Sequence, residues 1–597
     1  KSLTMAYEGE TKSVALTANC EWTTAPSAGW LTVAPASGNG ATTLSIVAAA
    51  NEGDARDGKV TITSKDGKAT AEIMVAQAGK PSDNPDPEPQ GNTIKTLEQL
   101  SEFLAKAAEV PADEEWSLEA DIDCNKAVIE PIKSFSGILD GKNHKVYNYA
   151  VVSKDATAGL FLNVSGTVKN VILGSKDGKS WDNFSTISFD ESVEATGHIG
   201  GVSAELLGTL ENVKNFAKVQ INMKGAKVGV GGIVGSITAP ANVRGCENGG
   251  QIALSIASMT DGAWVGGIVG HAENADILIE NCVNSVDLEF ADPNPKYLMY
   301  GGIVGCSHKG ATVDGCQNLG AVKLNQSVAE TSGTYIMIAG IAGALYTGSV
   351  VRNSVNKGEV SSNRMQVSRI GGIVGTLNSK GIIEGNTNEG KVVLKQANPN
   401  DNWQAAGGIC GFQEKENADN FIRNNTNKGS VSVEVENATT HNNKVSAGGI
   451  LGLGVLGLEI SGNVNSGEVS VVNKAAGPCY AGGIVGWYKG AGTFTSKNEN
   501  SAKVSCATSD NAAAVAGGVV GYSSDAANVS TEDKNTGAVV CANAAAAGSI
   551  AGTNMGKLVN CKAGGSVNGT ALSSDNLGKL TQGASSSGTA EGTTLAN

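Results

Sequence analysis

The sequence has no run of 18 apolar residues, few aromatic residues and few charged ones. Without such a run, no segment is expected to cross a bilayer as a helix. Aromatic residues make up 5% and charged residues 17% of the 597 residues, whereas 79 are glycine. A helix-rich fold would need more Leu, Glu and Lys. The composition therefore predicts an all-β fold of short strands and tight turns, in which glycine supplies positive φ.

Basic residues are also scarce. The 44 Lys and Arg residues are outnumbered by 58 Asp and Glu residues, which gives a formal charge of −14. No basic stripe could neutralise phosphates, so nucleic acid is excluded as a partner and electrostatic docking to an anionic membrane is disfavoured. The sequence opens at Lys1 without a signal segment, and we expect that such a segment was removed or left out.

Metal and disulfide chemistry lack their usual signatures. The eleven cysteines include no Cys-x-x-Cys pair and no histidine at metal-ligand spacing. Cys246, Cys282 and Cys316 share one repeat position, which predicts small residues stacked in a core, with disulfides or a metal as alternatives. Because the histidines are scattered and share no partner, we expect neither a metal site nor a cofactor. The five histidines are His144, His198, His271, His308 and His441.

One motif, Gly-Gly-Ile-Val-Gly, recurs through most of the chain and is complete at 266–270. The residue after its second glycine marks each copy. Neighbouring markers lie between 31 residues (Val202 to Ile233) and 41 residues (Ile409 to Ile450) apart. A near-constant period of this length predicts stacked repeats rather than separate globular domains. The markers are Val202, Ile233, Ile268, Ile303, Ile341, Ile373, Ile409, Ile450, Ile484, Val519 and Ile550.

Each repeat predicts three short strands. The glycine motif is the first, a segment such as 277–282 is the second, and a third such as 388–394 follows an Asn-x-Gly turn. Three strands per period describe one coil of a parallel β-helix, which the general rule for parallel connections makes right-handed. An asparagine recurs at the turn from Asn248 to Asn500. Stacked amides can bond from coil to coil, so we assign these asparagines a structural role.

Residues 1 to 80 lack the repeat and predict a small β-sandwich. The segments 59–63 and 71–75 alternate as strands do, with the hairpin signal Asp66-Gly67 between them.

The segments Cys20-Glu21-Trp22, Gly29-Trp30-Leu31 and Gln77-Ala78-Gly79 resemble the Bacteroidetes-associated carbohydrate-binding often N-terminal (BACON) domain. This resemblance implies an immunoglobulin-like sandwich of extracellular proteins, with carbohydrate binding as the function that the name proposes. We expect Trp22 and Trp30 to lie in the sandwich core.

A Pro-rich linker is expected at residues 81 to 92, followed by the β-helix at 93 to 597. Residues 96 to 109 predict a capping helix, in which Thr96 and Gln99 form a capping box. The segment 135–144 that follows resembles the start of extracellular β-helix proteins with GLUG-type repeats. Residues 571 to 597 are expected to form a C-terminal cap and a loose tail.

Catalysis on a β-helix requires carboxylates or bases lined up on neighbouring coils. Glu280, Asp314 and Glu384 share the second strand, but Arg352 and Arg423 interrupt their row. The pattern is typical of a solvated outer face, and we assign no catalytic residue.

For binding, the residue after the closing glycine of the motif forms a column that becomes large toward the C-terminus. It includes Phe412, Trp487 and Tyr522, which we predict as ligand-binding residues because stacked rings could meet the apolar faces of sugars. In the alternative, these side chains shield a corner between strands. Further aromatic residues, which we expect in loops, could widen the surface: Trp264, Trp403, Tyr480 and Tyr488.

The sequence thus predicts an all-β protein with an immunoglobulin-like sandwich, a right-handed parallel β-helix and one N-terminal capping helix. We expect a monomeric, adhesin-like binding protein, secreted or on the outer cell surface and attached by a lipid anchor at most. Glycan is the favoured ligand class, and a host or microbial surface protein is the other partner considered. The alternatives are a polysaccharide lyase or glycoside hydrolase, and a structural stalk.

Overall fold

The computed structural model divides the chain into two compact units, Lys1–Gly91 and Asn92–Asn597, each with its own hydrophobic core. The expected linker, residues 81 to 92, lies outside the described residues except for Asn92, which begins β9 (Asn92–Ile94). Among the described residues, no helix combines the length and apolar character needed to span a membrane. The structure describes residues 1–80, 92–189, 196–291, 297–325, 335–363, 368–396, 404–414, 419–436, 444–475, 477–492, 494–510 and 513–596.

The N-terminal unit is a sandwich of two sheets, with strand orders β1-β8-β7-β3-β5 and β2-β6-β4. Their alternating apolar residues meet in one core, where Trp22 is buried and donates from Nε1 to Gly40 O at 2.9 Å. Trp30 packs partly buried at the edge of that core, under the Arg56 guanidinium. The strands are β1 (Ser2–Met5), β2 (Glu10–Leu16), β3 (Glu21–Pro26), β4 (Leu31–Ala34), β5 (Ser37–Asn39), β6 (Thr42–Ala48), β7 (Arg56–Ser64) and β8 (Thr70–Gln77).

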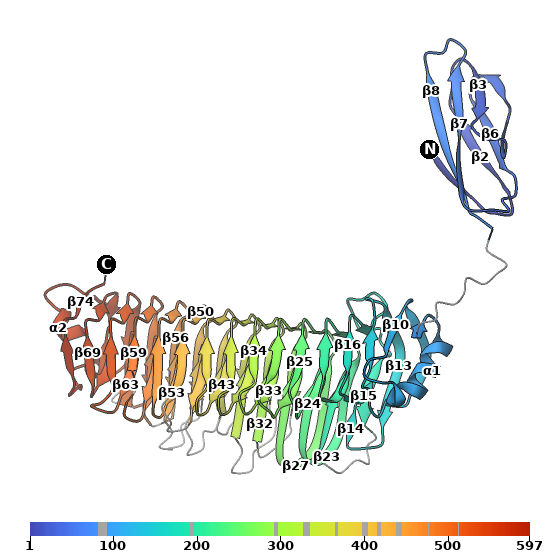
Figure 1. The fold of residues 1–597 in the computed structure, drawn as a ribbon. Coiled ribbons are helices and arrows are strands. Elements are labelled where there is room, and N and C mark those ends of the chain that lie inside the picture. Colours follow the sequence, from blue (N-terminus) through green and yellow to red (C-terminus); the bar gives the residue numbers. More distant parts are fainter. Residues whose placement is uncertain are drawn as a thin grey trace. The chain divides into compact units, whose positions relative to one another are not determined.

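The second unit is a long parallel β-solenoid whose coils stack in sequence order (Figure 1). A coil holds five paired strand segments, so the predicted three was wrong. Every segment pairs in parallel with its equivalent in the next coil, as Met299 does with Met337. One coil consists of β32 (Tyr297–Gly301), β33 (Val304–Ser307), β34 (Thr312–Asp314), β35 (Gln317–Asn318) and β36 (Val322–Asn325).

The glycine motif is a corner between two strands, which explains the miscount. In this coil β32 ends at Gly301 and β33 begins at Val304. Ile303 and Val304 both point into the core, because the corner reverses the alternation expected of a single strand. A Cβ on Gly302 would lie 2.1 Å from Gly340 O, so only glycine allows the coils to approach this closely.

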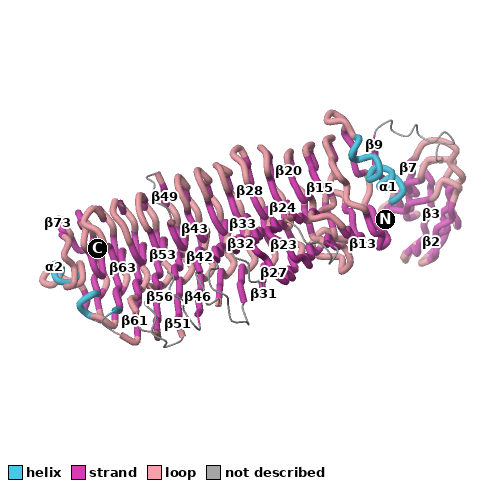
Figure 2. Tube along the Cα trace, turned by 90° about the horizontal axis from the view of Figure 1, so that it is seen from below, coloured by secondary structure: helices cyan, strands magenta, loops and turns pink. Residues whose placement is uncertain are grey.

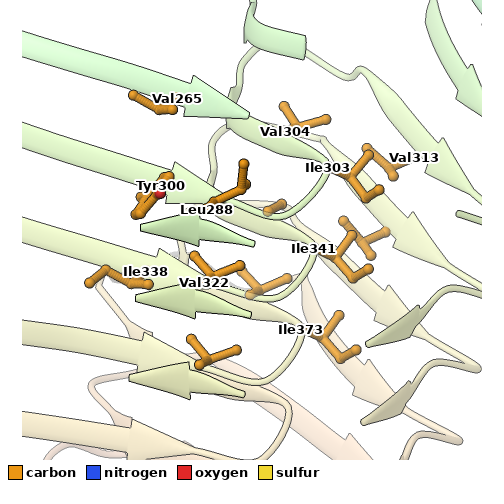
Figure 3. Close-up of a cluster of buried hydrophobic side chains, with 14 of the residues drawn as sticks. Val265, Leu288, Tyr300, Ile303, Val304, Val313, Val322, Ile338, Ile341 and Ile373 are labelled. Atoms are coloured by element: carbon orange, nitrogen blue, oxygen red, sulfur yellow. The ribbon is translucent and has the colours of Figure 1, made fainter. Parts of the chain in front are cut away.

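The core of the solenoid is continuous from the first coil to the last. Figure 3 shows Ile303, Ile341 and Ile373 stacked one above the other, with Val313 beside Ile303. Each coil buries its apolar residues only by stacking on its neighbours, as expected for a repeat protein.

The asparagine column is a ladder of side-chain amides, which confirms its structural role. Asn284 Nδ2 donates to Asn318 Oδ1 at 2.8 Å, and Asn318 donates in turn to Asn356 at 2.9 Å. The pattern continues to Asn535. These amides are buried and bonded to one another from Asn248 to Asn535, so the ladder fixes the register of these coils.

The cysteine column is buried, as expected, and it continues as a second ladder. All eleven cysteines lie in described segments and are free thiols. After Ser354 the same position holds Asn386, which bonds to Asn425, and the series ends at Asp533. This repeat position thus holds either a small residue or an amide, because the coils leave little space there.

Both ends of the solenoid are covered. At the N-terminal end, α1 (Leu97–Lys106) begins at Thr96, whose side chain accepts from Gln99 N at 3.3 Å, and Phe103 packs into the core. At the C-terminal end, Leu577 and Leu580 of α2 (Leu577–Leu580) pack against the last coils.

The expected loose tail was wrong, because β73 (Thr589–Glu591) extends the sheet beside β69 (Lys557–Val559). The chain therefore continues its coil beyond α2.

Candidate functional site

A second, smaller layer of side chains lies outside the main core, between the strand before and the strand after the glycine corner. In β32, Leu298 and Tyr300 enter the main core, whereas Met299 points the other way and meets Cys306 of β33. We call this the outer layer. Its two columns run the length of the solenoid, and Figure 2 shows the second column's strands β43 (Val374–Leu377), β53 (Leu451–Gly454) and β63 (Val520–Ser523).

The residues of the outer layer follow from the strand register. The first column is His198, Gly229, Trp264, Met299, Met337, Arg369, Ala405, Ser446, Tyr480 and Val515. The second column is Glu205, Ser236, His271, Cys306, Ala344, Thr376, Phe412, Leu453, Trp487, Tyr522 and Thr553.

Two of the three predicted ligand-binding residues are buried in this layer. Phe412 and Trp487 are each 2% exposed, whereas Tyr522 is partly exposed. The ring of Tyr480 lies 5.0 Å from Trp487 and stacks on Tyr522 at 5.1 Å. Phe412 and Trp487 therefore pack as the corner-shielding alternative describes, because the facing column covers their rings. Only Tyr522 of the three reaches solvent, and ligand contact by these residues stays a prediction.

The other aromatic residues considered from the sequence differ in position. Trp264 and Tyr480 belong to the outer layer, Tyr488 is buried in the main core, and Trp403 lies outside the described residues. The sequence had placed Trp264 and Tyr480 in loops, because neither residue belongs to the glycine motif from which the columns were counted.

The N-terminal half of the outer layer brings histidines together, so the expectation that they share no partner was wrong. His271 Nε2 lies 3.2 Å from His308 Nδ1, and Cys306 Sγ lies within 4.8 Å of both ligand atoms. His271 Nδ1 lies 2.8 Å from Glu273 Oε1. Sequence spacing hid the cluster, because His271 and His308 are far apart in the chain but on neighbouring coils. His441 lies outside the described residues.

The electrostatics of this cluster follow from its burial. Burial lowers the pKa of His198 to about 4 and that of His308 to about 4, so both are neutral at pH 7. The adjacent His271 imidazole is the main cause that lowers the pKa of Glu273, to about 2. Burial raises the pKa of the Cys306 thiol well above its usual range. At this cluster, His308 thus contributes a neutral imidazole, Cys306 a protonated thiol and Glu273 a carboxylate.

The row of carboxylates on the second predicted strand is neutralised by its neighbours. Arg352 Nε lies 2.7 Å from Asp314 Oδ2, and Arg423 Nη2 lies 3.1 Å from Glu384 Oε2. The arginines that interrupt the acidic row are therefore its ion-pair partners on adjacent coils. Paired in this way, these carboxylates do not form the facing acid and base that glycoside hydrolysis requires.

A family match among the comparisons with known proteins concerns the N-terminal unit. Residues 21–78 match the family described as "BACON: Putative binding domain, N-terminal". No curated protein matched the chain. Among solved structures, the chain is similar to "Bacteroides ovatus GH5 xyloglucanase in complex with a XXXG heptasaccharide", at 20% identity and a TM-score of 0.13. That similarity covers 20% of this chain and 24% of the other, and it carries no argument about this chain.

Proposed function

We propose that this chain is a binding protein of the extracellular space or outer cell surface, with glycan as its favoured ligand class. The observation that carries the proposal is the match of residues 21–78 to a family described as a binding domain. The resemblance of this segment to the BACON domain is the reason for favouring carbohydrate. The matched residues lie in a sandwich with its own core, separate from the solenoid core. A domain with its own core can bind a ligand independently of the solenoid.

The solenoid contributes a second surface in this proposal. Tyr522 is partly exposed and stacked on Tyr480, so its ring is held in one orientation. A fixed aromatic face can pack on the apolar face of a sugar ring at low entropic cost. Trp487, one coil before Tyr522 in the same column, supports that ring from within the outer layer. Of the three predicted residues, we expect only Tyr522 to touch the ligand.

A glycan array probed with three proteins tests the proposal. These are the intact chain, residues 1 to 80 and residues 92 to 597, since each fragment retains a complete hydrophobic core. We expect uncleaved glycan to be retained by the intact chain and by both fragments. Binding by no piece would contradict a glycan ligand and favour a protein partner. Cleavage of a bound glycan would contradict a pure binding protein and support the enzyme alternative.

The contribution of the solenoid is tested with Tyr522→Thr, because Thr553 occupies the same position in the next coil. We expect the fragment 92 to 597 to lose glycan binding about tenfold, the effect of about 1.4 kcal/mol from one stacked ring. Phe494→Thr is the matched control, since Phe494 is 41% exposed on a different sheet whose equivalent position holds Thr312. An equal loss in both variants would remove Tyr522 as a specific contact.

A further inference from the structure

We propose that His271, Cys306 and His308 form a binding site for a zinc-class divalent metal ion. This site is independent of glycan binding. His271 lies on β28 (Val269–Ala272), and Cys306 occupies the equivalent position one coil later, on β33. His308 follows Cys306 by two residues, after the end of β33. The coil-to-coil register thus places three ligand-bearing side chains in one corner of the outer layer.

The spacing of the two ligand nitrogens fits tetrahedral coordination, and the sulfur lies close to both. With Zn–N bonds of about 2.0 to 2.1 Å, two nitrogens of a tetrahedral site lie about 3.3 Å apart. His271 Nε2 and His308 Nδ1 are 3.2 Å apart, and all three ligand atoms lie within 4.8 Å of one another. Two imidazoles and a thiolate suit Zn²⁺ rather than Mg²⁺ or Ca²⁺, which prefer oxygen ligands.

The surroundings of His271 support this assignment. Metal-bound histidines commonly place their second nitrogen against a carboxylate, which fixes the ring and the tautomer. Glu273 Oε1 lies 2.8 Å from His271 Nδ1, on the side of the ring away from His308. The Trp264 ring stacks on His271 at 4.3 Å with an interplanar angle of 11°. The Nε2 atom of His271 is therefore directed toward the other two ligands.

Packing alone does not explain why cysteine and histidine occupy these positions. In the two following coils the position of Cys306 holds Ala344 and Thr376, so the fold demands neither sulfur nor imidazole there. Three protein ligands leave a fourth coordination position for water or another donor, as in open zinc sites.

Zinc binding to the full chain tests the site. The protein is treated with a chelator, dialysed against zinc, and assayed for bound metal by elemental mass spectrometry and for affinity by chelator competition. We expect one tightly bound zinc per chain. Cys306→Ala, which introduces the residue found at Ala344, and His308→Ala should each weaken binding by more than about 100-fold. Glu273→Gln should weaken it by about 10- to 100-fold, as changes around metal ligands do.

The control is Cys316→Ser, because Cys316 lies in the other cysteine column and the next coil has Ser354 at its position. This variant should bind zinc as the wild type does. With Co²⁺ in place of zinc, the wild type and Cys316→Ser should show a thiolate-to-cobalt charge-transfer absorption that Cys306→Ala lacks. No bound zinc in the wild type, or equal affinity in Cys306→Ala and the wild type, would overturn the proposal. Because the cobalt spectrum is read on the wild type, a failure of one variant to fold leaves the test intact.

Discussion

The two halves of the outer layer share a backbone and differ in chemistry. Toward the N-terminus the layer holds histidines and a cysteine around Trp264, and toward the C-terminus it holds Tyr480 and Trp487 in apolar packing. Both halves are built on the same glycine corner and the same register. The comparison shows that the backbone of this solenoid gives the outer layer the same geometry in every coil. The two side chains that each coil contributes then determine whether the outer layer is polar or hydrophobic at that coil.

The two halves meet at Arg369, which belongs to neither type. Its guanidinium lies 4.1 Å from the Phe412 ring and 3.0 Å from Glu414 Oε2, so it packs on an aromatic face and pairs with a carboxylate. A buried arginine is stable only with such partners. Arg369 therefore joins the polar half to the aromatic half without an uncompensated charge.

The largest expected effect is a loss of stability when a ring is removed from the aromatic half, which tests whether that half packs as a core. Trp487→Ala should lower the free energy of unfolding by about 3 to 5 kcal/mol, because it removes a ring that is 2% exposed and leaves a cavity. Denaturant unfolding of the fragment 92 to 597 measures the loss. Tyr522→Thr should cost clearly less, since its ring is partly exposed. Equal costs would show that the layer does not pack as a core.

A second pair of variants tests whether the asparagine ladder contributes equally to stability beside the two halves of the outer layer. Asn318→Ala near the histidines and Asn465→Ala near the aromatic rings each break the asparagine ladder, where their amides bond to Asn356 and Asn500. Both should cost about 1 to 3 kcal/mol, the range for a buried amide left without its partner. Thermal unfolding measures both. A cost that differs between the two sites would mean that the ladder depends on the chemistry of the layer above it.

Acid should destabilise the polar half. The pKa of His198 is about 4 in the folded chain and near 6.5 when unfolded, so the unfolded chain binds more protons between these values. Stability is therefore complete above pH 6.5 and falls as the pH drops toward 4, by on the order of 3 kcal/mol for this group.

The dependence of the unfolding temperature on pH, measured between pH 7 and 4.5, checks this. His198→Ser should flatten the slope. The control Tyr480→Ser alters the same column in the aromatic half, where Ser446 precedes it, and should change stability without changing the slope. A slope that is unaffected by His198→Ser would contradict the prediction.

The smallest expected effect has the opposite sign. Asp533 ends the second ladder beneath the aromatic half, and burial raises its pKa above the ordinary value. The folded chain therefore holds the proton more tightly, and stability falls as the pH rises from about 4 through the folded-state pKa. Asp533→Asn continues the ladder of amides without this penalty. We expect a gain of about 1 kcal/mol or less at pH 7, seen as a higher unfolding temperature. A lower unfolding temperature would show that the carboxylate is needed where it is.

Much of the fold could be predicted from the sequence, because it depends on local and periodic signals. The period of the glycine motif predicted the solenoid, the Thr96 capping box predicted α1, and the Asp66-Gly67 signal predicted the β7–β8 hairpin. The asparagine column was also predictable, since one residue type returned at one repeat position. Each of these features depends on neighbouring residues in the chain or on equivalent positions in successive coils.

The outer layer was not predictable, because it depends on how two strands of one coil fold against each other. The sequence identified the column that contains Phe412 and Trp487, but not the facing column that buries it. The same geometry joined His271 to His308, which the linear spacing had kept apart. Composition and period by themselves determined a stacked, glycine-cornered all-β chain, because they govern backbone conformation and repetition. Only the tertiary structure determined which side chains pack together in the outer layer. Contact and burial depend on the register between coils and on the turn at each glycine corner.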